Sequence, residues 1–340
     1  MKAAIVVKPG VLVVKDIPPP AITGEYDVLC RILYGATCSG TDEHLIHGRI
    51  PWPVSYPVLL GHESVGVVEA VGVKVRHIKK GDILTSVGVP SREGYFSFGG
   101  GFAEYGLARD HWAMKEDGLA QKLWQPYLIN QVVPGDIPPD QATMIVTWRE
   151  TLSYITRMKV ASGSRILIIG SGGNGLAFAA HAKGIGAKEI VMIGSGGRGD
   201  IAARAGVTGY FDYRREPYKG VAASYPSGFD FIIDAIGKRG QINAALAVAA
   251  ENATVGIYGI DDRNENSIAV SAVRKTFTFY AGGYVASEVH GEVVRRMRDG
   301  SLDASLWIDV SRPYPLERIG EAFAAVERRE CVKALVACNQ

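Results

Sequence analysis

Two short segments near the start of the chain carry side chains that could hold a metal ion. They are CSGTDEH at residues 38–44 and GHE at residues 61–63. A catalytic zinc takes about three ligands from cysteine, histidine and carboxylate groups and keeps one position open for substrate. Cys38, His62 and Glu63 would supply that set. Asp42 could in turn orient His62 through a hydrogen bond. The spacing also fits an ordinary alternative, a core cysteine and a surface His-Glu pair.

A glycine-rich run indicates a second kind of site. Residues 170–175 read GSGGNG, which fits the pattern GxGxxG, and they directly follow the apolar stretch RILIIG at 165–170. In a dinucleotide-binding turn the first glycine makes the bend, the second lets the backbone approach a pyrophosphate, and the third lets the helix pack closely. The helix N-terminus then faces the phosphate charge. We expect cofactor contacts from Gly170, Gly172, Gly173, Asn174 and Gly175; an ordinary glycine turn is the alternative.

The next apolar strand, EIVMIG at 189–194, bears on the choice between NAD(H) and NADP(H). NAD-specific sites place an Asp or Glu at its end, where the carboxylate bonds the ribose hydroxyls and would repel a 2′-phosphate. Here the strand ends at Gly194, followed by Ser195 and, three residues later, Arg198. Ser195 can donate a hydrogen bond to a phosphate, and Arg198 can pair with its charge. We therefore expect a preference for NADP(H), with dual cofactor use as the alternative.

The elements that must position these residues change in character along the chain. Residues 1 to about 110 read as short β segments between glycines, which suggests a small barrel-like β domain. A proline-rich connection follows at 132–143. From about residue 147 apolar strands alternate with helical stretches, as in a parallel sheet covered by helices. The segment 316–337 reads as a helix and a closing strand. The sequence predicts an α/β protein with two domains.

Bulk properties exclude several classes of function. The 340 residues carry a formal net charge of only +2, so we expect no nucleic-acid or anionic-membrane partner. No apolar stretch reaches the roughly 18 residues of a transmembrane helix, and the N-terminus does not read as a signal peptide. We expect a cytoplasmic protein. The four cysteines do not form a disulfide framework, and Cys30, Cys331 and Cys338 read as core residues.

Taken in order, these segments resemble a zinc-containing member of the medium-chain dehydrogenase/reductase superfamily. The similarity covers nearly the whole chain and rests on MKAAIV, VKDIPPP, GATCSGTDEHLIHG, PVLLGHESVGVVEAVGVKV, KKGDIL, GGGFAEY, GSGGNG and EAFAAVERRECVKALV. The combination of GHE, VGVV and KKGD at this spacing is specific. The resemblance implies a GroES-like β-barrel catalytic domain at 1–147 and a Rossmann NAD(P)-binding domain at 148–286. Residues 287–340 would return to the catalytic domain.

The resemblance also implies roles for individual residues. Cys38 and His62 match zinc ligands, and Glu63 matches a glutamate that is a ligand or an alternating ligand in relatives. Thr41 matches the hydroxyl residue that passes on the alcohol proton. His44 matches a histidine that carries this proton to solvent in some relatives, although a solvated surface histidine is the alternative.

A further match concerns the cofactor. Tyr213, in GYFDYRR, falls where NADP-dependent relatives place an aromatic residue beside the 2′-phosphate. Arg214 and Arg215 add positive charge nearby.

The chain departs from the family pattern in three places. Ser39 follows Cys38 as an inserted residue, so that Ser39 stands in the usual cysteine column; we keep Cys38, because a thiolate is the better zinc ligand. Val146 stands where relatives often have a third ligand, so that Glu63, Glu150 or water would complete the shell. The segment 86–102 has no cysteine, and we expect one catalytic zinc and no structural zinc.

The implied reaction is oxidation of an alcohol by NADP⁺ to a carbonyl compound, or its reverse. The missing structural-zinc lobe and the glutamate after His62 resemble the polyol and sugar dehydrogenases, which favours a secondary alcohol, polyol, sugar or cyclitol. A zinc-free quinone or enoyl reductase of the same superfamily, or a non-catalytic NADP(H)-binding protein, remains an alternative. We expect a homodimer or homotetramer that pairs the apolar, aromatic edge around 270–285, because such an edge is poorly tolerated in solvent.

Overall fold

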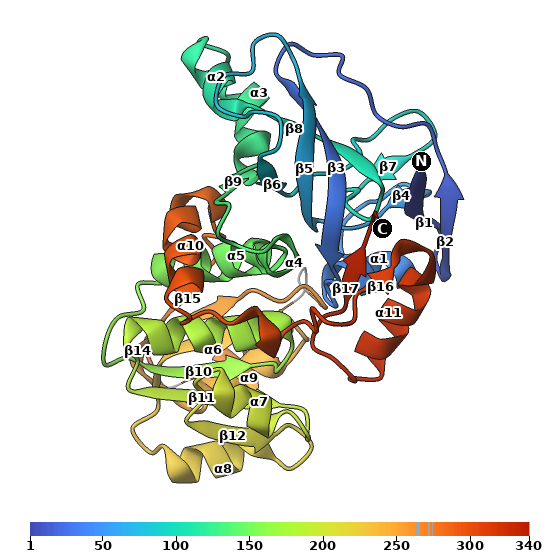
Figure 1. Cartoon of the computed structure of the whole chain (residues 1–340). Coiled ribbons are helices and arrows are strands. Elements are labelled where there is room, and N and C mark those ends of the chain that lie inside the picture. Colours follow the sequence, from blue (N-terminus) through green and yellow to red (C-terminus); the bar gives the residue numbers. More distant parts are fainter. Residues whose placement is uncertain (263–265, 271–272, 274, 340) are drawn as a thin grey trace. The chain divides into compact units, whose positions relative to one another are not determined.

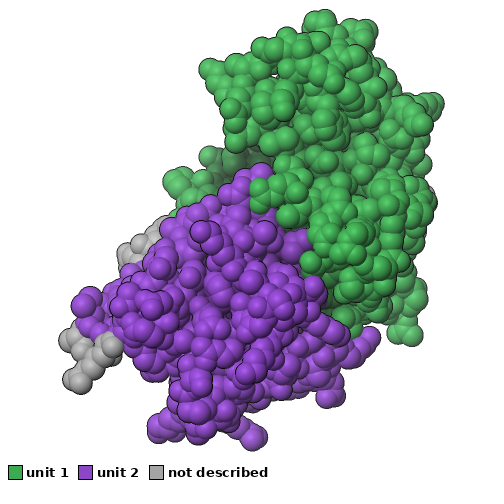
Figure 2. Space-filling model, turned by 90° about the vertical axis from the view of Figure 1, so that its left-hand side faces the viewer, with its two compact units in different colours: residues 1–149, 286–340 green, residues 150–285 purple. Residues whose placement is uncertain are grey.

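A computed structural model describes residues 1–262, 266–270, 273 and 275–339 of the chain (Figure 1). The chain divides into two compact units (Figure 2). Unit 1 consists of Met1–Arg149 and Ala286–Gln340, and unit 2 is Glu150–Val285. Within the described residues, no helix combines the length and the apolar character needed to cross a membrane.

Unit 1 is built mainly from two sheets. The first has the strand order β2-β1-β4-β7, with bounds β1 Lys2–Lys8, β2 Val11–Asp16, β4 Val58–Leu59 and β7 Phe96–Ser97. The second has the order β16-β17-β3-β5-β6-β9, and β8 also pairs with β3. Its strands are β3 Asp27–Ala36, β5 Glu63–Val71, β6 Ile83–Thr85, β8 Tyr105–Arg109, β9 Val132–Val133, β16 Tyr314–Pro315 and β17 Leu335–Ala337.

One apolar core joins the two sheets of unit 1 to the C-terminal helix. It includes Ile5 of β1, Ile32 of β3, Phe102 and Phe323, all of them buried. The last strand, β17, pairs antiparallel with β3, with Val336 opposite Gly35. The C-terminal segment is therefore a structural part of unit 1, and it lies beside the end of β3 from which the metal-donor residues begin.

The helices of unit 1 are short. They are α1 Thr41–His47, α2 His111–Glu116, α3 Gln121–Trp124, α4 Pro139–Ala142, α10 His290–Arg298 and α11 Ile319–Glu327, with 3-10 turns at Gln125–Ile129, Ala286–Val289, Ala304–Leu306 and Leu316–Arg318. Helix α5, Met144–Arg157, runs across the boundary between the units.

Unit 2 contains a six-stranded sheet in the order β12-β11-β10-β13-β14-β15, and every pairing is parallel. The strands are β10 Arg165–Ile169, β11 Glu189–Gly194, β12 Gly209–Asp212, β13 Phe229–Asp234, β14 Ala249–Ile257 and β15 Phe277–Tyr280. The helices are α6 Gly173–Ile185, α7 Gly199–Arg204, α8 Pro217–Ser224 and α9 Gln241–Leu246. The predicted α/β class with a parallel sheet is confirmed.

The strand order in unit 2 determines where a ligand can bind. The central strands β10 and β11 are buried nearly throughout, as expected when helices cover both faces of a parallel sheet. The order reverses between β10 and β13, and in such sheets ligands bind beyond the carboxyl ends of the strands at this reversal. The glycine run at 170–175 starts directly after β10, at that end of the sheet.

Candidate functional site

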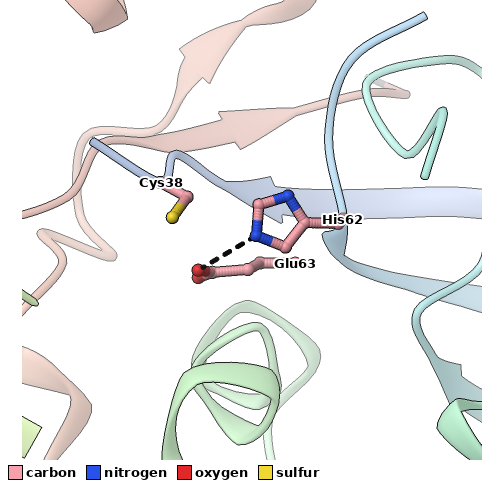
Figure 3. Close-up of side chains that lie close together, drawn as sticks. All are labelled: Cys38, His62 and Glu63. Carbon is pink, nitrogen blue, oxygen red and sulfur yellow. Dashed lines mark ion pairs between the residues drawn. The ribbon is translucent and has the colours of Figure 1, made fainter. Parts of the chain in front are cut away.

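Three of the predicted metal donors meet in unit 1. One ligand atom each from Cys38, His62 and Glu63 lies within 4.8 Å of the other two (Figure 3). Cys38 follows β3 and Glu63 begins β5, and these strands pair antiparallel with Ala36 opposite Glu63. The two donor segments therefore meet because they occupy the same end of one β ladder. Cys38 and Glu63 are buried, whereas the imidazole keeps 21% of its surface exposed.

Asp42 connects the cysteine to the histidine. Its Oδ2 accepts a hydrogen bond from the backbone N–H of Cys38 at 2.9 Å, and its Oδ1 lies 3.7 Å from His62 Nδ1. The backbone N–H of Asp42 in turn donates to the carbonyl oxygen of Cys38 at 2.9 Å, so the chain already winds as a turn before α1. Asp42 is fully buried, and this burial raises the pKa of its carboxyl group. Ser39 is only half-buried.

The donor group concentrates negative charge around the imidazole. Burial by itself lowers the pKa of His62, but the hydrogen bond and charge of Cys38, with the charges of Asp42 and Glu63, outweigh it and raise the pKa to about 10. The Nε2 atom of His62 lies 3.8 Å from Glu63 Oε1. A site that attracts a proton so strongly is also suited to a metal cation, because both are stabilised by the same negative groups.

Lys333 completes this site, and sequence reasoning missed it. Its Nζ lies 2.7 Å from both carboxylate oxygens of Glu63 and donates to the carbonyl oxygen of Thr37 at 3.0 Å. The side chains of Lys333 and Glu63 are each only 3% exposed. Burial lowers the pKa of Lys333, but the negative charges of Glu63 and Cys38 outweigh it, so that the pKa is raised overall. The signal that could have revealed it is a lysine within the apolar run CVKALVAC.

The glycine run in unit 2 has the geometry of a phosphate-binding turn. Gly170 has a backbone φ of +111°, a conformation that residues with a side chain rarely adopt. A Cβ on Gly175 would lie 1.9 Å from the carbonyl oxygen of Gly170, so the start of α6 packs closely on the turn. A Cβ on Gly172 would meet nothing within 4 Å, and this N-cap residue of α6 has no side chain to cap the helix. Gly173 and Asn174 form the first turn of that helix.

The end of β11 has no room for the carboxylate of an NAD-specific site. A Cβ on Gly194 would lie 2.3 Å from the hydroxyl oxygen of Tyr210 and 2.5 Å from Ser171. That hydroxyl donates to the carbonyl oxygen of Ser195 at 2.7 Å, and the backbone N–H of Ser195 donates to Ser171 Oγ at 3.1 Å. Tyr210 and Ser171 therefore leave room only for a glycine at position 194. Arg198 is half-buried just before α7.

Comparison with known proteins shows the family. Residues 24–118 match the alcohol dehydrogenase GroES-like domain, and residues 173–293 match the zinc-binding dehydrogenase domain. The chain belongs to the zinc-binding alcohol dehydrogenases of the medium-chain dehydrogenase/reductase superfamily. The resemblance that the motifs indicated is thereby confirmed, together with the pairing of a GroES-like domain with a Rossmann domain. This dehydrogenase is an oxidoreductase.

Relatives of this dehydrogenase match it over nearly their full length. Sorbitol dehydrogenase of Bacillus subtilis (strain 168) is 24% identical and covers 100% of this chain and 98% of its own. L-galactonate-5-dehydrogenase of Escherichia coli (strain K12) is also 24% identical, over 95% of this chain and 94% of its own. Among solved structures, alcohol dehydrogenase TADH from Thermus sp. ATN1 has a TM-score of 0.84 at 22% identity, with 100% of both chains covered.

The remaining predicted residues of the dehydrogenase take separate positions. Thr41 is the first residue of α1 and His44 lies one turn further along the same helix, both half-buried. Val146 is buried in α5, and its side chain has no atom that could bind a metal ion. Glu150 belongs to unit 2, where it accepts a hydrogen bond from the hydroxyl of Tyr258 at 3.0 Å.

Proposed function

We propose that this dehydrogenase oxidises a secondary alcohol of the polyol or sugar type, or reduces the matching carbonyl compound. It would use one zinc ion per chain and NADP(H) as the preferred coenzyme, unit 1 being catalytic and unit 2 binding the coenzyme. The observation that carries the proposal is the meeting of a thiol, an imidazole and a carboxylate within 4.8 Å of one another.

The chemistry of the donor set fits zinc. Cysteine sulfur, histidine nitrogen and a carboxylate oxygen are the three ligand types that zinc favours, and a three-residue set leaves a position for substrate. When bound, zinc would polarise the substrate oxygen as a Lewis acid and the nicotinamide would exchange the hydride. Asp42 would hold the imidazole in orientation, and Lys333 would hold the carboxylate of Glu63.

We assign the proton path to α1. Thr41 would accept the proton of the alcohol, and His44 on the same helix would carry it toward solvent. The position of both residues on one short helix, directly after the turn that carries Cys38, supports this assignment.

The substrate class is supported by relatives. The names sorbitol dehydrogenase, L-galactonate-5-dehydrogenase and D-xylulose reductase all describe enzymes of polyol, sugar or sugar-acid metabolism. The coenzyme preference is supported by the crowding at Gly194, which excludes an acidic side chain. Solved structures of similar fold hold either coenzyme: a Sinorhizobium meliloti 1021 protein (TM-score 0.77, 22% identity, 99% of this chain and 98% of its own) was solved with NADP, and an Escherichia coli CFT073 protein (TM-score 0.78, 18% identity) with NADH. The preference therefore rests on the residues of this chain.

We also propose that the dehydrogenase forms a homo-oligomer through the edge of the unit 2 sheet at β15. Strand β15 lies at that edge, and Phe279, Tyr284 and Val285 expose large apolar side chains there. Within the predicted segment 270–285, residues 271–272 and 274 lie outside the described residues. The test is light scattering at micromolar concentration, and a measured mass equal to that of one chain would contradict this proposal.

The decisive experiment combines metal analysis with an alcohol panel assayed with NADP⁺ and NAD⁺. We expect one zinc per chain, loss of zinc and activity together in Cys38→Ala, and retention of most of both in Ser39→Ala. Loss of zinc in Ser39→Ala alone would reverse the assigned ligand. A metal-free protein that reduces quinones or enones would instead identify the zinc-free reductase.

A further inference from the structure

A second ion pair between an acid and a base lies at the coenzyme end of unit 2, on either side of Tyr213. Asp212 ends β12 and pairs with Arg214 two residues later. We propose that Arg214, held in place by Asp212, binds the 2′-phosphate of NADP(H), with Arg215, which lines the adjoining pocket, as a second cation. This inference rests on the proposed coenzyme preference and names the residue responsible for it.

The register of the sheet places this pair beside the critical strand end. β11 and β12 lie side by side (Figure 1) and run parallel, and their register places Gly194 opposite Asp212. A Cβ on Gly196 would lie 2.4 Å from Arg214 Nη2 and 2.7 Å from Asp212 Oδ2. The ion pair therefore lies directly against the loop that follows β11, where the adenosine ribose binds in folds of this type.

A pocket of about 450 Å³ opens at the same place. It is lined by Gly196, Gly197, Gly199, Tyr210, Asp212 and Arg215, among others. Its volume lies within the usual range for small-ligand sites. The glycine backbone and Arg215 supply hydrogen-bond donors suited to a phosphate group, and Arg214 lies against this pocket at Gly196.

The hydrogen bonds within the pair decide which of its two charges faces a ligand. Arg214 donates to Asp212 from Nε at 3.2 Å, from Nη2 at 2.8 Å and from its backbone N–H at 3.0 Å. These bonds lower the pKa of Asp212 to about 2, so the carboxylate is ionised and neutralised by its partner. The guanidinium is 62% exposed, against 17% for Asp212. Among the described residues its bonds to Asp212 use Nε and Nη2, which leaves Nη1 for a phosphate oxygen.

The competing role for Asp212 is recognition of the ribose hydroxyls of NAD(H), because its strand end neighbours the position that carries the acid in NAD-specific sites. The observed bonds argue against this role, since both oxygens of Asp212 already accept from Arg214. The ring of Tyr213 lies 5.9 Å from the Arg214 guanidinium and gives it a second contact. Asp212 is thus a positioning residue and Arg214 the binding residue.

Two coenzyme fragments test this without any turnover. Calorimetric titration of the intact protein with 2′,5′-ADP and with 5′-AMP reports the contribution of the 2′-phosphate alone. We expect Arg214→Ala to weaken 2′,5′-ADP binding about tenfold or more and to change 5′-AMP binding less than about twofold. Asp212→Asn should weaken 2′,5′-ADP binding to a smaller extent. Lys219→Ala, which breaks another exposed ion pair of unit 2, is the matched control and should change neither.

Four results would overturn the inference, and the last of them would also refute the coenzyme preference on which it rests. Tighter 2′,5′-ADP binding in Asp212→Asn would make Asp212 a repelling group, and weaker 5′-AMP binding would make it a ribose acceptor. If Arg198→Ala lost the preference for 2′,5′-ADP over 5′-AMP and Arg214→Ala kept it, Arg198 would be the phosphate contact. The proposed preference for NADP(H) would then still stand. A parent protein that binds both fragments equally would refute the NADP(H) preference itself, leaving the zinc and alcohol chemistry untouched.

Discussion

The two candidate sites each contain an acid paired with a base, and the pairs differ in almost every physical respect. Glu63 and Lys333 stand 270 residues apart in sequence and are each 3% exposed. Asp212 and Arg214 stand two residues apart, and the arginine is 62% exposed. The first pair is formed by the fold and is enclosed by it. The second is formed by one turn of the chain and remains open to a ligand.

This difference predicts which function each pair can serve. A buried ion pair is costly to break, because removing one partner leaves an uncompensated charge without water. An exposed pair is weakened by solvent and contributes little to stability. The pair at the metal donors therefore fixes the position of a carboxylate, whereas the pair in unit 2 can rearrange its bonds around an incoming phosphate. Four variants and one pH series sharpen this contrast.

The largest effect is expected for Lys333→Met, which leaves the buried carboxylate of Glu63 without its partner. We expect the free energy of unfolding to fall by about 3–5 kcal/mol. Urea denaturation measures this, and Lys333→Met combined with Glu63→Gln should recover part of the loss. An unchanged unfolding midpoint in the single variant would show that the buried pair does not stabilise the fold.

A smaller loss of stability is expected from a steric clash at Gly194, which involves no buried ion pair. Gly194→Asp would introduce the acid of NAD-specific sites against the hydroxyl of Tyr210 and against Ser171. We expect a loss of about 1–3 kcal/mol from overpacking and no switch to NAD(H). Gly199→Asp is the control for stability alone, because its Cβ would meet Tyr210 at an ordinary 3.9 Å. Gain of tight NADH binding in Gly194→Asp would contradict the steric argument.

Asp42→Asn tests the residue that links the cysteine to the histidine. The amide has the same shape but no charge, so we expect zinc affinity to fall about 10–100-fold, as for other residues that orient a metal ligand. Competition with a chelator measures it. Glu43→Gln alters the neighbouring carboxylate on α1 and should leave zinc affinity close to that of the parent.

A pH series tests the buried histidine of α2. Burial lowers the pKa of His111 to about 4, below the value of about 6.5 for an unfolded chain. Between these values the unfolded state binds more protons, so stability should decrease as pH falls from 6.5 to 4. His290 behaves in the same way. Thermal unfolding at pH 7 and pH 4.5 should show a smaller drop in Tm for His111→Phe than for the parent; equal drops would mean that His111 is not protonated on unfolding.

The smallest effect on stability is expected for Arg214→Ala. Because the pair with Asp212 is exposed, the midpoint of urea unfolding should stay close to that of the parent although phosphate binding is lost. A large loss of stability would place this pair in the same class as Glu63 and Lys333 and would remove the contrast between the two sites.

Much of the architecture was predictable from local sequence. Apolar runs such as 165–170 and 189–194, each followed by glycines, predicted parallel strands with turns at their carboxyl ends, because strand periodicity and glycine conformations are properties of neighbouring residues. The motifs around Cys38, His62 and the glycine run indicated the family, which the comparisons confirmed. The roles of individual site residues remain predictions that the experiments above address.

The amino-acid sequence by itself determined the class of fold, the family and the types of side chain available for chemistry. Tertiary structure alone decided which residues distant in sequence meet. The pairing of β17 with β3 brings Lys333 to Glu63, and the pairing of β11 with β12 brings Asp212 beside Gly194. No local pattern encodes either contact, because the partner of a charged side chain depends on which strands lie side by side, and that choice is made by burial of the whole core.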